Sequence, residues 1–304
     1  MKDLILIIGK GSISFKHYKI LKKIYKKKKI LHISSRYFFS NQKHFLKKNY
    51  FLTVVSNDAK SHIKTLKKIY KISNFIFIEK PLSDNFLEAK KCLTNKLKKK
   101  IWVGYNLNFS SLINKVSEII KLQKYGRLIS ARSVVGYNVR YWRKKDYKKT
   151  VSINKKLGGG VLNELSHEIN YLINLLGELK LMKSVTFKSF YKQFDVEDSV
   201  YATLINKNKI LVNLVMDFYR EDNFRECQLI FEKGTVFMNF IKNKIEFKNK
   251  TNSKIIFQNK NDLELTYLRQ WIYLKKVLNF QISNYKNINN SLLTLKLTNQ
   301  IKKL

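Results

Sequence analysis

An alternation of short apolar runs and amphipathic segments fills the first 105 residues, and it constrains the fold more than any other feature of the sequence. Between the first two runs, Ile13, Ile20 and Ile24 recur at helical spacing. Strands that alternate with helices are typical of parallel βαβ units. The pattern predicts a doubly wound parallel sheet with strands at residues 4–8, 30–34, 51–56, 75–79 and 101–105.

From about residue 120 the strand-like runs follow one another directly, separated by polar turns, which predicts a large and mostly antiparallel sheet. One helix, residues 161–176, interrupts this series, and two more close the chain near residues 263–280 and 291–304. The expected strands are residues 128–137, 182–190, 200–205, 210–218, 227–231, 236–241 and 255–258.

Chain length and the change of rhythm together predict two domains in an α/β protein. Residues 1–118 would form the domain with the doubly wound parallel sheet. Residues 119–304 would form an α+β domain around the antiparallel sheet.

The net charge of +40 invites a nucleic-acid interpretation, because Lys and Arg neutralise phosphates. Yet only 8 of the 61 basic residues are Arg, the residue that bidentate phosphate recognition favours. The lysines are also spread along the whole chain. We interpret the charge as a solvated surface that binds polyanions nonspecifically, and expect no specific nucleic-acid partner.

The two cysteines and the apolar run near the amino terminus indicate the cellular compartment. Cys92 and Cys227 are isolated, without a disulfide framework or metal-ligand spacing, which agrees with a reducing cytoplasm and with no bound metal. Residues 4–8 are too few for a signal-peptide core or a membrane span. We therefore expect a cytoplasmic protein with no membrane partner.

The segment IIGKGSISFKH places Gly9 and Gly11 where the first strand ends and the first helix begins. Glycines there permit a tight turn and the close approach of a dinucleotide pyrophosphate, which the N–H groups of the helix N-terminus would bind. Ser14 replaces the third glycine of the fingerprint and is small enough to let helix and strand approach. The segment predicts a Rossmann-type site for NAD or NADP, with Ser12 and Ile13 in its first helical turn.

The second strand ends in HISSRYF, at the place where an acidic residue would normally bind the adenosine ribose. Ser34, Ser35 and Arg36 would instead bind a 2′-phosphate, which a carboxylate would repel. NADP is therefore favoured over NAD. The alternative is that Arg36 is simply exposed at a strand end.

The predicted helix 161–176 directly follows three consecutive glycines and carries polar residues along one side. One interpretation is an ordinary amphipathic helix, whose polar side, including His167, faces solvent. A sharper interpretation is that Glu164, one turn earlier, orients the His167 imidazole while the glycines let a ligand come close. The same side carries Asn163, Asn170, Tyr171 and Asn174.

The stretch IEKPLS contains Pro81, the only proline of the chain, directly after Glu79 and Lys80. Lys80 follows the fourth strand, on the carboxyl edge where open α/β sheets bind ligands. Next to a positively charged nicotinamide and partly desolvated, Lys80 would have its pKa lowered toward usefulness as an acid or base. Pro81 fixes the backbone there, and a cis peptide bond would direct Lys80 into the cleft. The alternative is that Lys80 is one surface lysine among many.

Five ordered motifs together resemble the Gfo/Idh/MocA family of NAD(P)-dependent oxidoreductases, named for glucose–fructose oxidoreductase and inositol dehydrogenase. These motifs are IIGKGSISFKH, VVSNDAKSHIKTL, FIEKPLS, VGYNLNFS and GGGVLNELSHEINYLINLLG. The stretch YWRKKDYKKTVSINKKLGGG is similar to a branch of the family often associated with bacterial surface sugars. The resemblance implies a Rossmann domain followed by an α/β domain with a large, mostly antiparallel sheet.

The resemblance also implies roles for residues that match the family's motifs. Lys80 would contact the nicotinamide ribose and the substrate hydroxyl, Glu79 would support Lys80, and His167 would transfer the proton. The matching positions of the cofactor cleft are Asn57, His62 and Asn106.

The chain departs from the family pattern near these positions. Glu164 stands where Asp is usual, and it precedes His167 by three residues instead of the commoner four. Asn170 replaces another usual Asp, and Arg, His and Pro are replaced by Asn108, Ser110 and Ser111. We interpret the departures as altered substrate contacts, while the competing interpretation is weak or absent catalysis.

The sequence therefore predicts an oxidoreductase that moves a hydride between the nicotinamide and a sugar, sugar acid or nucleotide-sugar, in carbohydrate or surface-glycan metabolism. His167, oriented by Glu164, would take the hydroxyl proton, and Lys80 would hydrogen-bond the alkoxide. An exposed face of the second sheet would favour a homodimer or homotetramer. The alternative is a non-catalytic cofactor- or sugar-sensing protein of the same fold. The candidate substrate contacts are Trp142, Arg143, Tyr147 and Asn163.

Overall fold

The structure is a computed structural model, and it describes residues 4–142, 146–188, 190, 193–280 and 282–303. The chain forms two compact units. The first unit comprises Met1–Tyr105 and Tyr267–Leu295, and the second comprises Asn106–Thr266 and Lys296–Leu304. The division into domains of residues 1–118 and 119–304 stays a prediction, because a compact unit need not be a unit of folding.

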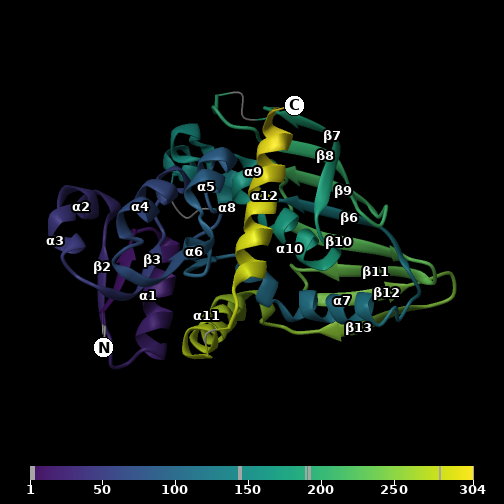
Figure 1. Cartoon of the computed structure of the whole chain (residues 1–304). Coiled ribbons are helices and arrows are strands. Elements are labelled where there is room, and N and C mark those ends of the chain that lie inside the picture. Colours follow the sequence, from purple (N-terminus) through teal and green to yellow (C-terminus); the bar gives the residue numbers. More distant parts are fainter. Residues whose placement is uncertain (1–3, 143–145, 189, 191–192, 281, 304) are drawn as a thin grey trace. The chain divides into compact units, whose positions relative to one another are not determined.

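A parallel sheet forms the centre of the first unit, in the strand order β2-β1-β3-β4-β5. Figure 1 labels β2 and β3 of this sheet. β1 pairs with both β2 and β3, so the strand order reverses at this point. In open α/β sheets, ligands bind at such a switch point, outside the carboxyl ends of the strands. The strands are β1 Leu4–Ile8, β2 Lys29–Ile33, β3 Tyr50–Val55, β4 Ser73–Ile78 and β5 Ile101–Val103.

Short connections and helices join these strands. The connections of the first unit are α1 Ser12–Ile24, α2 Ser35–Ser40, α3 Gln42–Leu46, the 3-10 turn η1 Ala59–Ser61, α4 His62–Ile69, α5 Phe86–Cys92 and α6 Asn95–Lys98. Two long helices close the chain, α11 Asp262–Phe280 and α12 Tyr285–Lys303.

Both faces of the parallel sheet are buried. On one face, Ile63 and Leu66 of α4 belong to a core with alternate strand residues and with Ile288 of α12. On the other face, Phe77 of β4 stacks against Trp271 of α11, with ring centroids 4.6 Å apart. Successive side chains of a strand point to opposite faces, so apolar runs such as β4 serve both cores. The doubly wound architecture predicted from the sequence is confirmed.

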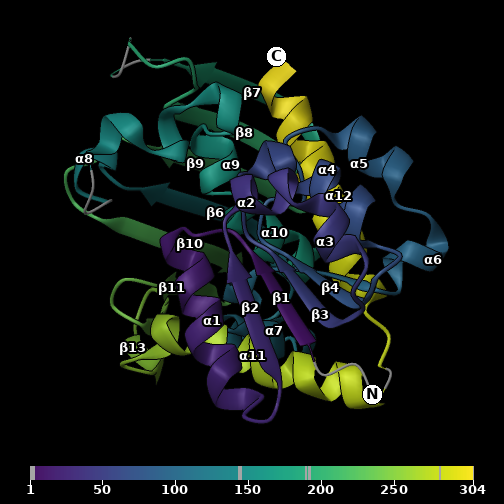
Figure 2. The same ribbon diagram turned by 90° about the vertical axis from the view of Figure 1, so that its left-hand side faces the viewer.

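The second unit is built on an eight-stranded sheet in the order β13-β12-β11-β10-β6-β9-β8-β7. β6 and β9 are parallel, and every other neighbouring pair is antiparallel, as predicted. Figure 2 shows α8 following the tip of β6. The strands are β6 Leu128–Gly136, β7 Leu179–Phe187, β8 Ser199–Asn206, β9 Leu211–Asp217, β10 Phe224–Phe231, β11 Gly234–Asn239, β12 Lys244–Lys248 and β13 Ser253–Gln258.

The helical elements of the second unit lie before and between these strands. They are η2 Asn106–Phe109, α7 Ser111–Lys121, α8 Val139–Trp142, η3 Tyr147–Lys149, η4 Val151–Ile153, η5 Lys155–Leu157, α9 Val161–Glu164 and α10 His167–Leu176. Residues of the inner sheet face, such as Val135, Leu214 and Leu229, are buried. On the outer face, Val185 and Tyr201 pair across β7 and β8 and are exposed.

Three expectations about elements were wrong. The predicted helix 161–176 breaks into α9 and α10 at Leu165 and Ser166. The Ser166 hydroxyl donates to the Asn163 carbonyl at 3.0 Å, a local hydrogen bond that competes with the helical ladder. Strand β12 was not predicted, and the last helix begins at Tyr285 instead of residue 291.

The polar residues of α10 are less exposed than the amphipathic interpretation held: His167 and Asn174 are half-buried, and others are fully buried. Glu168, Asn170 and Tyr171 are each at most 2% exposed. A buried polar face needs internal partners. These three residues are therefore part of the interior of the second unit.

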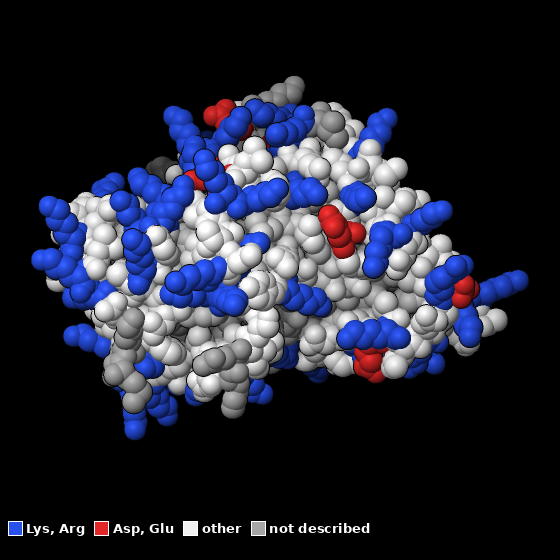
Figure 3. All heavy atoms as spheres, viewed as in Figure 1, with Lys and Arg blue, Asp and Glu red and all other residues white. Residues whose placement is uncertain are grey.

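Basic side chains are scattered across the face of the molecule shown in Figure 3, and acidic ones are few. This distribution agrees with a solvated basic surface. Within the described ranges, no helix combines the length and apolarity that crossing a bilayer requires.

Candidate functional site

The turn after β1 requires glycine at its first position. Gly9 has φ +136°, and a Cβ added to it would lie 2.4 Å from the Ser56 carbonyl oxygen. The Gly9 N–H donates to the Ile33 carbonyl and the Ser56 N–H to the Ile8 carbonyl, both at 2.9 Å. The turn is thereby fixed to the ends of β2 and β3, at the switch point of the sheet.

Gly11, in contrast, faces open space. It is the N-cap of α1, and a Cβ added to it would meet no atom within 4 Å. No acidic side chain occupies the first turn of α1, where Ser12 and Ile13 begin the helix. A helix N-terminus with room above it attracts anions, so these residues fit a dinucleotide pyrophosphate.

Ser14 stabilises the turn through hydrogen bonds. Its hydroxyl donates to the Gly9 carbonyl at 2.8 Å, and its oxygen lies 2.7 Å from Nε2 of His32. Because the Ser14 hydrogen is used, the Ser14 oxygen accepts from His32 Nε2–H. Burial and the nearby Lys10 lower the pKa of His32, which favours this neutral donor.

The residues predicted to bind the 2′-phosphate lie at the start of α2, not on the end of a strand. Ser34 caps this helix, with its hydroxyl accepting from the Tyr37 N–H at 3.1 Å. The Asn57 amide donates to the Ser35 hydroxyl at 3.2 Å, so the structure brings two predicted cofactor residues together. Arg36 is exposed beside them.

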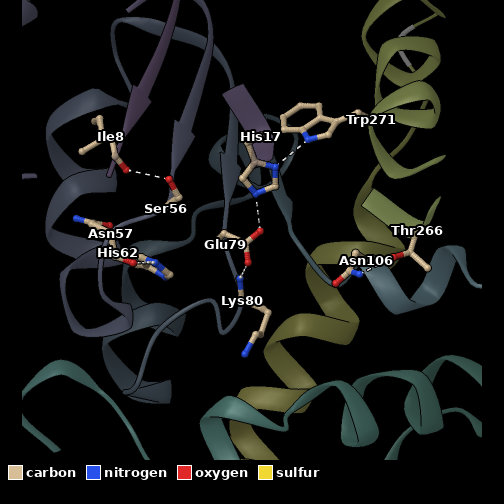
Figure 4. A network of polar contacts seen from close by, with 10 residues as sticks. All are labelled: Ile8, His17, Ser56, Asn57, His62, Glu79, Lys80, Asn106, Thr266 and Trp271. Carbon is tan, nitrogen blue, oxygen red and sulfur yellow. Dashed lines mark hydrogen bonds and ion pairs between the residues drawn. The ribbon is translucent and has the colours of Figure 1, made fainter. Parts of the chain in front are cut away.

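Glu79 and Lys80 follow β4 on the same carboxyl edge. The Glu79 carboxylate accepts from Nε2 of His17 at 2.6 Å and from the Lys80 N–H at 3.0 Å (Figure 4). The Lys80–Pro81 peptide bond is cis, and Lys80 is half-buried. Its conformation is thus supported by a carboxylate that is itself only 6% exposed.

His62 supports the other side of this turn. Its Nδ1 lies 2.8 Å from the Pro81 carbonyl and its Nε2 lies 3.2 Å from the Asn57 carbonyl. Burial lowers the pKa of His62, which favours the neutral ring with one N–H. The shorter contact indicates that Nδ1–H donates to Pro81. Asn106 belongs to the second unit, where its amide donates to the Thr266 hydroxyl at 2.7 Å (Figure 4).

His167 and Glu164 lie in the second unit, on either side of the break between α9 and α10. Both side chains are half-buried. Because the helix is broken, the spacing that placed Glu164 one helical turn before His167 does not apply. The orientation of His167 by Glu164 stays a prediction.

At two of the three glycines before α9, neighbouring atoms of the chain leave no room for a side chain. A Cβ on Gly159 would lie 2.2 Å from the Val151 carbonyl oxygen, and one on Gly160 would lie 2.3 Å from the Glu197 carboxylate. These glycines therefore permit close packing against the Val151 backbone and the Glu197 side chain, while the close approach of a ligand to them stays a prediction. Asn163 reinforces the turn, because its amide donates to the Gly158 carbonyl at 2.8 Å.

Two of the predicted substrate contacts, Trp142 and Tyr147, lie in α8 and in the 3-10 turn η3. Trp142 stacks on Tyr137 with ring centroids 5.7 Å apart, and Tyr147 meets Phe194 edge-on at 5.9 Å. Arg143 lies outside the described residues. Among the residues that the structure describes, no cluster of three His, Cys, Asp or Glu side chains is placed to hold a metal.

Residues 113–237 match the family model of the GFO/IDH/MocA C-terminal domain. The match runs from α7 into β11 of the second unit. It agrees with the resemblance seen in the sequence motifs, while the surface-sugar branch stays a prediction.

Several solved structures share the fold over nearly the whole chain. Levoglucosan dehydrogenase, in complex with NADH and levoglucosan, has a TM-score of 0.82 at 12% identity, covering 100% of this chain and 97% of its own. A 3-ketoreductase from Actinomadura kijaniata, in complex with NADP and TDP-benzene, has a TM-score of 0.80 at 11% identity, covering 100% and 98%. A myo-inositol dehydrogenase from Corynebacterium glutamicum has a TM-score of 0.75 at 14% identity, covering 100% and 96%. At these identities the likeness establishes the fold alone. No curated protein matches the chain by sequence.

Residues 113–237, the region that matches this family model, contain a largely buried ion pair that was not predicted from the sequence. Arg225 of β10 donates to Glu168 of α10 from Nε at 2.6 Å and from Nη2 at 3.1 Å. Burial by itself would lower the pKa of Arg225, but the Glu168 carboxylate raises it, so the guanidinium stays charged. Glu168 directly follows His167, and the pair therefore anchors the first turn of α10.

Proposed function

We propose that the chain is an NAD(P)-dependent oxidoreductase that transfers a hydride to or from a hydroxyl or carbonyl carbon of a sugar, sugar acid or nucleotide-sugar. The observation that carries this proposal is that the glycine turn and Lys80 lie at the same edge of the first sheet. There the turn at Gly9 and Gly11 follows β1, and Lys80 follows β4, with β3 between these two strands. A dinucleotide on the N-terminus of α1 would occupy the switch point of the sheet.

The roles of the side chains follow from their chemistry. A bound nicotinamide supplies the hydride chemistry. In the oxidative direction, a ring nitrogen of His167 would accept the hydroxyl proton, and Glu164 would orient the ring. The Lys80 ammonium would donate a hydrogen bond to the oxygen as negative charge develops on it.

The substrate class is proposed from relatives and from the surroundings of α8. The related levoglucosan dehydrogenase is complexed with levoglucosan, and the related ketoreductase with a TDP compound. Stacked Trp142 and Tyr137 offer an aromatic surface of the kind that sugar rings pack against. A role in surface-glycan metabolism would follow if nucleotide-sugars are the preferred substrates.

Turnover of a substrate panel tests the proposal. Purified protein is assayed by the absorbance of the reduced cofactor, with NADP and NAD and with sugars, sugar acids and nucleotide-sugars. Replacing Lys80→Ala should lower kcat by about 10²- to 10⁴-fold while NADPH binding is retained. Lys19→Ala removes an exposed lysine of α1 and serves as the matched control. Cofactor binding without turnover of any substrate would favour the sensing protein instead.

We also propose that the chain forms a homodimer or homotetramer through the outer face of its large sheet. Phe187, Tyr201 and Leu211 are exposed there, between 47% and 50%. Exposed apolar sheet faces mark interaction surfaces, and soluble oligomers are mostly symmetric. Light scattering of the wild type and of Tyr201→Lys tests this, and a monomeric wild type would contradict it.

A further inference from the structure

We propose that Trp271 holds His17 in a single tautomer, and that His17 thereby positions Lys80 through Glu79. The inference rests on the proposed function, in which Lys80 acts on the substrate. Trp271, His17 and Glu79 are positioning residues in this scheme, and all of them belong to the first unit.

The tautomer of His17 follows from the hydrogen-bonding capacity of indole. Trp271 Nε1–H lies 2.9 Å from Nδ1 of His17, and an indole N–H can only donate. His17 Nδ1 must therefore present a lone pair. In the neutral ring the hydrogen is on Nε2, which lies 2.6 Å from Glu79 Oε1 and donates to it.

The Glu79 carboxylate then has two hydrogen-bond donors, one for each oxygen. Oε1 accepts from the His17 ring, and Oε2 accepts from the backbone N–H of Lys80 at 3.0 Å. A carboxylate can accept at both oxygens, whereas an amide has one oxygen and one donor group. The charge of Glu79 is thus matched to a site with two N–H donors.

Close packing leaves this network little freedom. His17 is 0% exposed, and its ring meets Phe77 edge-on with centroids 4.9 Å apart. Phe77 in turn stacks on Trp271. A Cβ on Gly104 would lie 2.8 Å from the Phe77 ring and 3.0 Å from Glu79 Oε1, so glycine at this position leaves room for the carboxylate.

Two buried histidines therefore fix the backbone around Lys80, one on each side of it. His17 acts through Glu79 on the N–H of Lys80, and His62 donates to the carbonyl of Pro81 at 2.8 Å. Two fixed points around the Lys80–Pro81 peptide bond define where the Lys80 side chain begins. Displacing a catalytic group by about 1 Å can cost about 100-fold in rate.

The first variant tests the requirement for two acceptors. In Glu79→Gln, one of the two N–H donors must face the new amide N–H₂, because Trp271 prevents the His17 ring from exchanging its tautomer. We expect kcat to fall by about 100-fold, with the KM for the cofactor little changed. A general loss of folding would instead lower the melting temperature together with the apparent kcat.

The second variant tests the tautomer itself. Trp271→Phe keeps an aromatic ring against Phe77 and removes the N–H, so His17 is free to carry its hydrogen on Nδ1. Its Nε2 can then accept from the amide of Gln at position 79. The double variant Glu79→Gln/Trp271→Phe should therefore be about tenfold more active than Glu79→Gln alone, a coupling typical of residues in contact. Trp102→Phe, at a buried tryptophan of β5, is the matched control and should not rescue Glu79→Gln.

Nitrogen-15 NMR of the histidine rings and of the Lys80 amide gives a readout independent of activity. The wild type should show His17 with its hydrogen on Nε2 and a Lys80 amide proton shifted downfield by the carboxylate. Glu79→Gln should reduce that shift, and adding Trp271→Phe should restore part of it. If no substrate is turned over, the proposed function fails, and these shifts then decide the positioning alone. Equal activities and equal Lys80 shifts in the single and double variants, or a His17 hydrogen on Nδ1 in the wild type, would overturn the inference.

Discussion

Arg225 and Glu168 form a two-point ion pair in which the Glu168 side chain is completely buried, and Glu168 is the residue next to His167. The pair joins strand β10 to the first turn of α10. A carboxylate in the first turn of a helix is also favoured by the helix dipole. The position of His167 in the second unit is thus tied to the interior of its sheet.

Removing one partner of this pair should be costly. Arg225→Met leaves the Glu168 charge buried without its counterion and should lower the free energy of unfolding by about 3–5 kcal/mol. Chemical denaturation measures this change. The double variant Glu168→Met/Arg225→Met should lose less than Arg225→Met, because no buried charge remains. The exposed pair of Arg127 and Glu232 supplies the control, since Arg127→Met should change stability little. A double variant less stable than the single would contradict this account.

His62 should make stability depend on pH below the ordinary histidine pKa of 6.5. Burial lowers the pKa of His62, so the unfolded chain binds a proton in a range where the folded chain does not. Its contribution is therefore present above pH 6.5 and is lost as the pH falls below it. Between about pH 7.5 and about pH 5.5, the wild type should lose about 1 kcal/mol more than His62→Gln. Urea denaturation at both pH values measures this, and parallel losses would show that His62 is not the group responsible.

The two glycines of the turn between β1 and α1 should separate folding from ligand binding. Gly9→Ala places a methyl group against the Ser56 backbone and should lower stability by about 1–3 kcal/mol or more. Gly11→Ala meets no atom of the chain, so its melting temperature should equal that of the wild type. Its methyl group occupies the space proposed for the pyrophosphate, and NADPH binding should weaken by about 10- to 100-fold. Fluorescence titration with NADPH measures the affinity. Unchanged affinity in Gly11→Ala would remove the pyrophosphate from this turn.

Arg36 should distinguish the two cofactors. A hydrogen bond to a charged group contributes about 1.5–3 kcal/mol, so Arg36→Ala should weaken NADPH binding by about 10- to 100-fold. NADH has no 2′-phosphate, and its affinity should change little. Calorimetric titration of both cofactors measures the difference, with Arg127→Ala as a control for the loss of one exposed positive charge. A wild type that prefers NADH would contradict the NADP assignment.

Much of the first unit could be predicted because its signals are local. The run at residues 4–8 coincides with β1, and the glycine turn after it is where the periodicity placed it. Strand β12 was missed because only Ile245 and Phe247 carry its buried face, between lysines at both ends. Its pairing with β11 and β13 makes it a strand. The break between α9 and α10 was missed because the hydrophobic periodicity continues through it.

By itself, the sequence determined the two kinds of sheet, the position of the glycine turn after β1 and the placement of Lys80 after the fourth strand. Periodicity and glycine spacing are properties of neighbouring residues, so they can be read without the fold. Only the tertiary structure decided that His17 contacts Trp271, 254 positions away, and that Glu168 is paired with Arg225, 57 positions away. A buried polar side chain takes its partner from whichever elements pack against it, and that packing is set by the burial of whole faces, not by local spacing.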